Sequence, residues 1–225
     1  MLLGGHDPLK GRCRGSIGQK MAICSPRITG LEDGRNGRME IVTDTFTKGE
    51  ATRAQLIAAA MELVHTEGVG SITARRLADK VGLKRQIVHY YFGTIDDVLI
   101  EVMRTGFRIA YQAIATQLLS RDPIDVIWDQ FSSTTPESAE FLALALRKET
   151  FGNVAREFAH ELHRLFGDAI ASDYQRRGLD PPAHPAALAL ILQATSQALG
   201  WEAALGFSSG HEQAKATLNA LLGRN

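Results

Sequence analysis

The sequence predicts an all-α protein, and three observations lead to this fold class. Apolar residues recur three and four positions apart in most segments after residue 51, which is the spacing of one helix face. Serine, threonine or aspartate precedes many of these segments, next to a proline or three residues before an acidic or amide side chain, as at helix starts. No segment shows the alternation of apolar and polar residues that is typical of strands.

Residues 1–46 contain few large apolar residues and follow no period, so we expect a disordered extension. An upstream extension of a protein that begins at Met21 or Met39 is the alternative. The segment lacks the continuous apolar stretch of a signal peptide. The only cysteines, Cys13 and Cys24, lie here, which excludes a disulfide framework and favours a reducing, cytoplasmic location.

The first helix is expected from Thr52 to Thr66. Thr52 and Gln55 are spaced as a capping box at its start, and Gly68 follows its end. Its buried face consists of four apolar residues at helical spacing, namely Ile57, Ala60, Met61 and Val64. This face is expected to pack against the two helices that follow.

Residues 73–91 read as two short helices joined by a tight turn. Thr73 can cap the first helix with its hydroxyl, and Gly82 can supply the positive φ at its end. The second helix begins with three long polar side chains, Lys84, Arg85 and Gln86. This is the arrangement of a helix-turn-helix, whose second helix lies in the DNA major groove and reads bases with its N-terminal residues.

The run T-A-R-R-L-A-D-K-V-G-L, followed after four residues by V-H-Y-Y-F, resembles the DNA-binding domain of the tetracycline-repressor (TetR) family of bacterial regulators. The resemblance implies a three-helix DNA-binding domain at residues 47–95 and a helical effector-binding and dimerisation domain at 96–225. The charges agree with this division. Seven basic and four acidic residues give 48–95 a net charge of +3, whereas eleven basic and sixteen acidic residues give 96–225 a net charge of −5.

Side-chain chemistry and the resemblance together assign eight residues to DNA: Thr73, Arg75, Lys84, Arg85, Gln86, Ile87, His89 and Tyr90. Lysine and arginine can donate to guanine, glutamine can pair with adenine, and the isoleucine can touch a thymine methyl group. The resemblance places Arg75 at a base. It places His89 and Tyr90 at phosphates and sugars, contacts that position the protein without reading sequence. The helix start at the threonine can offer backbone N–H groups to a phosphate. Val88, Tyr91 and Phe92 are expected in the core.

Two positions depart from the family pattern. Lys84 stands where the family usually has a Ser or Thr cap; losing a cap costs about 1 kcal/mol, and a cation opposes the helix dipole. A residue that disfavours the local fold is a candidate for a role at DNA. Ile95 replaces a lysine that is frequent in the family, so one phosphate contact is missing. A helical ligand-binding protein without DNA binding is therefore one alternative function.

From Thr94 the chain is predicted to be helical almost to its end. Thr94 and Asp97 can cap a long helix, and Asp122-Pro123 and Thr135-Pro136 each place a capping side chain before a proline at the first helical position. Four helices are therefore expected before the next prolines, at about 94–119, 122–133, 136–149 and 153–177.

The helix expected at 185–207 is apolar on nearly every side, and we expect it to be buried on all sides. Polar residues interrupt it, so it is not predicted to span a membrane. The last helix, at 210–223, follows a second apparent capping box formed by Ser209 and Glu212. These two helices are expected to form a four-helix bundle with a second copy, which makes the protein a homodimer.

Six aromatic residues lie on helices that, by the resemblance, surround an effector cavity: Phe107, Tyr111, Trp128, Phe131, Phe141 and Phe151. Ordinary core positions are the alternative for each of them. His160 and His163 lie near Glu157 and Glu161 but lack the H-E-x-x-H spacing, so no metal site is predicted. No catalytic or cofactor-binding motif is present, and we expect neither an enzyme nor a cofactor.

The function predicted from the sequence is that of a DNA-binding transcriptional regulator. We expect a repressor that binds a palindromic operator in double-stranded DNA and is released by a small, mostly apolar ligand. A transcriptional activator of the same family is the alternative, because both need specific DNA binding.

Overall fold

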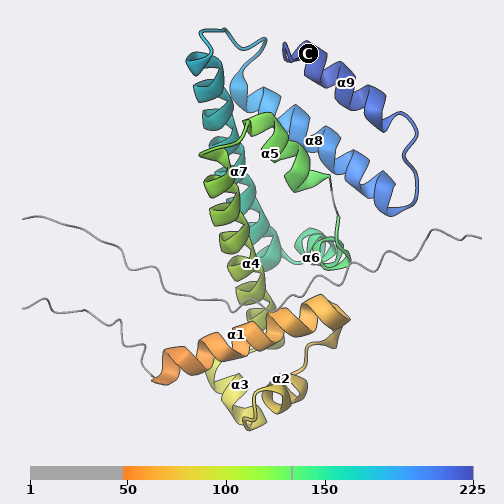
Figure 1. Cartoon of the computed structure of the whole chain (residues 1–225). Coiled ribbons are helices and arrows are strands. Elements are labelled where there is room, and N and C mark those ends of the chain that lie inside the picture. Colours follow the sequence, from red (N-terminus) through yellow and green to blue (C-terminus); the bar gives the residue numbers. More distant parts are fainter. Residues whose placement is uncertain (1–47, 133, 225) are drawn as a thin grey trace, which may run out of the picture. The chain divides into compact units, whose positions relative to one another are not determined.

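The computed structural model describes residues 48–132 and 134–224 (Figure 1). These residues form nine α-helices and one short 3-10 helix, with no strand among them, which confirms the all-α class. The extension predicted at 1–46 lies outside the described residues. No helix in the described part of the chain is long and apolar enough to cross a membrane.

The helices follow the predicted order. They are α1 (Lys48–Glu67), η1 (Val69–Ser71), α2 (Ala74–Lys80), α3 (Arg85–Tyr91), α4 (Ile95–Leu118), α5 (Pro123–Phe131), α6 (Pro136–Arg147), α7 (Glu149–Arg176), α8 (Pro185–Ala204) and α9 (His211–Leu221). Some ends differ from the prediction. Helix α7 begins four residues earlier than expected, so that only Lys148 separates it from α6, and α8 ends three residues earlier.

Four of the predicted caps are confirmed, those of α2, α4, α5 and α6. The Thr94 hydroxyl accepts a hydrogen bond from the backbone N–H of Asp97 at 3.1 Å, and the Asp97 carboxylate accepts one from the backbone N–H of Thr94 at 2.8 Å. Asp122 caps α5 through the backbone N–H of Ile124, and Thr135 caps α6 in a capping box with Ser138. Each cap satisfies N–H groups that the first helical turn leaves free.

Two other predicted capping boxes are wrong. Thr52 lies inside α1, which begins at Lys48, and its hydroxyl donates to the Lys48 carbonyl oxygen at 2.9 Å instead of capping. Ser209 does not cap α9, because the residue before this helix is Gly210 in the left-handed conformation at φ 83°, with no side-chain cap. In both places the spacing of a capping box was present but the backbone took another course.

The first core joins the N-terminal helices to the N-terminal parts of α4 and α7. Leu56, Leu77 and Val88 are almost fully buried together with Val98 of α4 and Phe151 of α7. Helix α4 packs against α1 and also against α7, so it belongs to both the helix-turn-helix module and the body (Figure 1).

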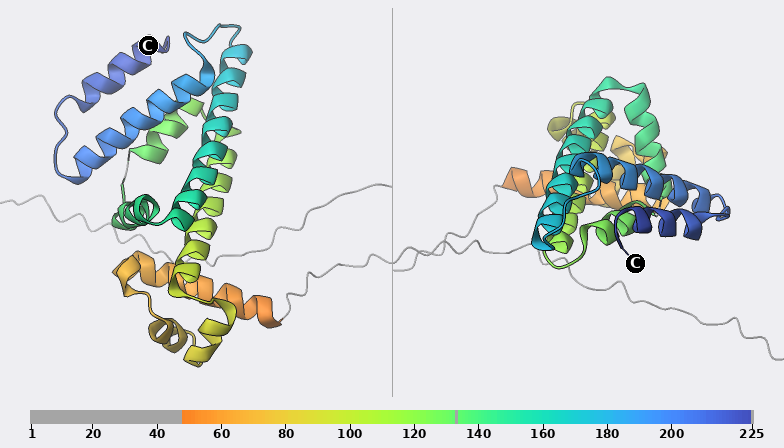
Figure 2. Two further views of the ribbon diagram at one scale, coloured as in Figure 1. Left: turned by 180° about the vertical axis from the view of Figure 1, so that it is seen from behind. Right: turned by 90° about the horizontal axis from the view of Figure 1, so that it is seen from above.

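The second core lies among α4, α5, α7, α8 and the C-terminal end of α9. Ile114, Ile127, Phe166 and Leu192 are its most buried large residues. Helices α4 and α7 run side by side, with α5 and α8 on one flank (Figure 2). The C-terminus is attached to this core by the Tyr174 hydroxyl, which donates to the Leu222 carbonyl oxygen at 2.8 Å.

Within a single chain α8 is buried on one face only, so burial on all sides, which was expected together with a second copy, stays a prediction. One face, which includes Leu188, Leu192 and the small residue Gly200, packs into the body. The other face exposes half of the surface of Leu190 and Ile191 and 44% of that of Trp201. The second apolar face therefore has no cover within the described residues of one chain.

Candidate DNA-recognition surface and effector cavities

The helix-turn-helix is built by local interactions. The Thr73 hydroxyl accepts from the Arg76 backbone N–H at 3.2 Å and starts α2. Gly82 turns the chain with φ 68°, and the Leu83 backbone N–H then donates to the Ala78 carbonyl oxygen at 2.9 Å. A side chain at position 82 would be strained by the positive φ, which explains the glycine.

Helix α3 begins without a side-chain cap. Lys84 occupies the cap position with extended backbone angles and makes no capping hydrogen bond. Burial holds the helix in place instead, since Val88 is 1% exposed and Phe92, which ends the helix, is 4% exposed. Ile95 is half-buried and packs against the same core. The structure thus assigns the departures at Lys84 and Ile95 to an exposed face and to the core, respectively.

The eight residues predicted to contact DNA lie on α2, on α3 or directly before these two packed helices. Seven are exposed and Ile87 is half-buried. Tyr90 is 80% exposed and meets Tyr91 edge to face at 5.1 Å between ring centroids. An aromatic side chain exposed to this degree gains little from its own fold and is available to a partner.

Ion pairs separate the cations of the module into two groups. Arg76 pairs with Glu67 at 2.5 Å, and Lys80 pairs with Glu62 at 2.8 Å, so both join α2 to α1. Arg75 lies 3.8 Å from Asp79 within α2. Lys84 and Arg85 have no ion pair and no hydrogen-bonded partner for their side chains among the described residues. The first group stabilises the module, and the second is free to meet an anion.

Acidic residues of α6 contact the N-terminal module, which the sequence did not predict. A Glu137 carboxylate oxygen lies 3.0 Å from His65 Nδ1 on α1. The Val69 backbone N–H donates to a Glu140 carboxylate oxygen at 2.5 Å. These partners are about seventy residues apart in the chain, and no local pattern announces such a pair.

Three hollows meet at Phe107 on α4. The largest has a volume of about 650 Å³ and lies among α1, α4, α6 and α7. Its lining is mainly apolar and consists of Met61, Val64, His65, Val102, Met103, Gly106, Phe107, Ala110, Thr135, Glu137, Ser138, Phe141, Leu142, Ala145 and Ala155. We call it the α1–α6 cavity. Its size and composition suit a small organic ligand.

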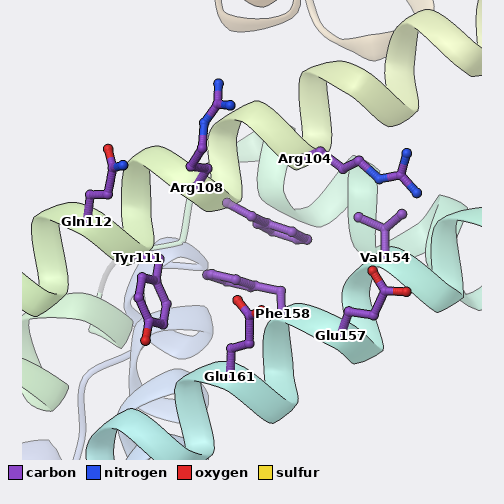
Figure 3. Close-up of a pocket in the computed structure, with 9 residues that line it drawn as sticks. Arg104, Arg108, Tyr111, Gln112, Val154, Glu157, Phe158 and Glu161 are labelled. Atoms are coloured by element: carbon purple, nitrogen blue, oxygen red, sulfur yellow. The ribbon is translucent and has the colours of Figure 1, made fainter.

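The other two hollows are more polar. One, of about 550 Å³, lies between α6 and the adjoining parts of α5 and α8, with Phe131, Gln130 and Gln197 in its wall. The second is a groove of about 350 Å³ between α4 and α7. In this groove Arg104 and Arg108 come from α4, and Glu157 and Glu161 come from α7 (Figure 3).

The six aromatic residues predicted to surround one effector cavity do not do so. Phe107 touches all three hollows, and its ring stacks on that of Phe158 with centroids 4.0 Å apart. Phe141, Phe131 and Tyr111 each line a different one of the three. Trp128 and Phe151 line none of them and are 7% and 0% exposed, because they fill the two cores.

The histidine–glutamate segment of α7 forms no metal-ligand cluster. In the described part of the chain no three His, Cys, Asp or Glu side chains gather closely enough to hold a metal ion. Glu157 and Glu161 instead line the groove between α4 and α7.

A helix-turn-helix with free cations on its second helix, joined to a helical body with apolar hollows, defines a DNA-binding regulator. The comparisons with known proteins agree. Residues 56–102 match the family model described as "Bacterial regulatory proteins, tetR family". The N-terminal module is therefore a tetR-family DNA-binding domain, as the sequence predicted. No curated protein matches the sequence.

Solved structures share the fold of the whole described chain. A TetR transcription regulator from Haloarcula marismortui has 18% identity and a TM-score of 0.62, over 77% of this chain and 97% of that one. NemR of E. coli in its reduced form has 17% identity and a TM-score of 0.61, over 76% and 98%. A protein from Saccharomonospora viridis in complex with choline has 16% identity and a TM-score of 0.61, over 78% and 97%. At these identities the likeness establishes the fold.

Proposed function

We propose that the protein is a homodimeric TetR-type repressor that a small, mostly apolar ligand releases from a palindromic operator. The observation that carries the proposal is the exposed start of α3, where Lys84 and Arg85 have no ion-pair or hydrogen-bond partner among the described residues. In a helix-turn-helix this position faces the base edges of the major groove. Residues 47–95 form the DNA-binding module in this proposal, and residues 96–225 form the body.

The eight candidate residues divide into two roles at DNA. Lys84, Arg85 and Gln86 read bases, because their donors match guanine and adenine edges. Ile87 touches a thymine methyl group, and Arg75 reaches a base from α2. His89 and Tyr90, together with the backbone at the start of α2, bind phosphates and sugars. Lys84 leaves the start of α3 without a side-chain cap, and its contact with a base offsets this cost.

The exposed apolar face of α8 supports a dimer. Leu190, Ile191 and Trp201 lie on this face, and Leu205 and Phe207 beyond its end are 85% and 52% exposed. A contiguous apolar surface of this kind on a water-facing helix is typical of a protein interface. Packing α8 and α9 against the same helices of a second copy buries it and gives the two-fold symmetry that a palindromic operator requires.

The α1–α6 cavity is the proposed effector site, and Phe107 and Phe141 belong to its wall. It is the most apolar of the three hollows that meet at Phe107, and it borders the module that binds DNA. The S. viridis protein with the same fold was solved in complex with choline, so the fold is able to bind a small molecule. A ligand that fixes the module in a different position weakens DNA binding by no more than its preference for that state.

The proposal is tested by a gel shift with DNA from beside the protein's own gene, followed by titration with candidate ligands. The two α3 helices of a dimer must enter major grooves about 34–36 Å apart or a multiple of this distance. Two half-sites at such a spacing are therefore expected in the DNA that is shifted. A ligand that releases DNA must itself bind more weakly, by the same factor, when operator is present. Ligand binding that is indifferent to operator contradicts the release mechanism, and the absence of any specific shift contradicts DNA recognition.

A repressor and an activator differ in the effect on transcription. Deletion of the gene raises expression of the adjoining genes for a repressor and lowers it for an activator. This measurement decides between the two regulators without reference to the ligand.

A further inference from the structure

The α1–α6 cavity contains a single carboxylate among otherwise apolar walls. Of the described residues that line it, only Glu137 is acidic and only His65 carries a second ionisable side chain. The remaining contacts are aliphatic, aromatic or methyl-bearing, apart from the hydroxyls of Thr135 and Ser138. Those two hydroxyls already bond each other's backbone in the capping box of α6, so Glu137 is the main polar feature left for a ligand.

Glu137 is kept ionised at the start of α6. A hydrogen bond from its own backbone N–H, and further ones from His65 and Thr135, hold the pKa of its carboxyl below the ordinary range against the burial that raises it. The positive end of the α6 dipole acts in the same direction. The cavity therefore presents a fixed negative charge in an apolar surrounding, where an unpaired charge is unfavourable.

His65 covers this charge only loosely. Its Nδ1 lies 3.0 Å from the Glu137 carboxylate, but its side chain is 78% exposed whereas that of Glu137 is 26% exposed. A polar contact with one partner in water contributes little, because water competes for the same groups and screens any charge. A cation that brings an apolar body into the cavity gains the same contact with Glu137 and also buries apolar surface.

We propose that the α1–α6 cavity binds an apolar molecule that carries one ammonium group, and that this group bonds Glu137 in place of His65. The inference rests on the proposed function, since it names the chemical class of the effector. An anionic ligand would face the Glu137 charge, and a neutral ligand would form a weaker hydrogen bond than a charged donor does. The shape and charge of the cavity thus favour an amphiphilic amine.

This exchange links the ligand to the DNA-binding module. Met61, Val64 and His65 lie on α1, so a bound molecule touches the module directly. Replacement of His65 removes a polar contact between α6 and the end of α1, and leaves the contact of Glu140 with Val69 of the 3-10 helix and the apolar packing of α6. Ligand binding therefore changes the attachment of the module to α6.

The test compares two probes with the same apolar body, 4-phenylbutylamine and 4-phenylbutan-1-ol. Their binding to the full chain is measured by calorimetry without DNA, at neutral pH. The amine is expected to bind at least about tenfold more tightly, as a charge-assisted hydrogen bond is stronger than a neutral one. Glu137→Gln should abolish this preference. Glu140→Gln, which changes a carboxylate of the same helix that does not line the cavity, should retain it.

A second variant keeps the test independent of the folding of Glu137→Gln. His65→Ala leaves the carboxylate in place and removes its competitor, so it should tighten binding of the amine more than that of the alcohol and widen the preference. The proposal is overturned if the amine does not bind, if the alcohol binds equally well, or if the preference survives Glu137→Gln. Because no DNA is present, these outcomes are separate from the gel shift, which tests the proposed function.

Discussion

Replacement of Arg85 by alanine separates base reading from general attraction to DNA. Arg85 is the first residue of α3, is exposed and has no partner for its side chain among the described residues. The substitution therefore removes no ion pair or side-chain hydrogen bond among the described residues. Alanine also has high helix propensity, and the substitution removes a cation from the positive end of the helix dipole. The melting temperature should therefore not fall.

The expected loss follows from the geometry of a two-fold dimer. One bidentate arginine–guanine contact is worth about 1–3 kcal/mol of discrimination. The dimer carries two distant copies of Arg85, whose effects should add, so the cognate site should lose about 2–6 kcal/mol. Random DNA should lose much less, because it offers each arginine only a phosphate or a mismatched base.

Fluorescence anisotropy with a cognate and a scrambled duplex of equal length measures both losses at one salt concentration. Arg76→Ala is the matched control, since Arg76 lies on the preceding helix but is engaged by Glu67 and by the Ser71 carbonyl oxygen. This variant should lower the melting temperature slightly and leave the ratio of the two affinities unchanged. An equal loss on both duplexes for Arg85→Ala would refute the assignment of Arg85 to base reading.

Three further predictions concern the dimer, the packing of α8 and the charge in the cavity. Ile191→Glu should convert dimers to monomers in analytical ultracentrifugation. Ile109→Glu, at an exposed isoleucine on α4, is the control and should leave the dimer intact. A dimeric Ile191→Glu would exclude the α8 interface. Gly200→Ala should destabilise the chain by about 1–3 kcal/mol in urea unfolding, because its Cβ would lie 2.7 Å from a backbone oxygen at the end of α5. Gly106→Ala, with open space around it on α4, should be neutral or stabilising, and equal effects would contradict this account. Because the pKa of Glu137 is lowered, its ionised carboxylate stabilises the fold above the ordinary glutamate pKa range, and this stabilisation is lost as the pH falls through the lowered pKa. The melting temperatures of wild type and Glu137→Gln should therefore converge in acid. A constant gap between them would be inconsistent with that pKa.

Local signals in the sequence predicted the helices and the helix-turn-helix. The caps at Thr73 and Thr94 and the turn at Gly82 depend on atoms within four residues, and all three are present in the structure. The same kind of signal failed at Thr52 and Ser209. A capping box states only that a helix can begin there, and the residues before it decide whether the helix extends further back or the chain turns at a glycine.

The candidate DNA surface was also accessible to the sequence, because it lies on one short helix whose buried residues are identified by their spacing. Val88 and Phe92 were expected inside and are buried, which leaves the first residues of α3 outside. The sequence placed Arg76 and Lys80 on a solvated helix face, away from DNA, but did not predict their ion pairs. Their carboxylate partners, Glu67 and Glu62, lie on another helix, α1.

Only the tertiary structure decided the cavities and the use of each helix face. Aromatic residues at helical spacing share a face whether that face meets a core or a hollow, so Phe151 and Phe107 could not be distinguished by pattern. The sequence shows that α8 is apolar on both faces, and the structure shows which of them meets its own chain. The pair of Glu137 and His65 depends on how α6 lies across the end of α1, a relation between elements that hydrophobic periodicity does not encode. Hydrophobic periodicity indicates which residues are shielded from water. The packing of elements distant in the chain decides whether those residues contact a core, a cavity or another subunit.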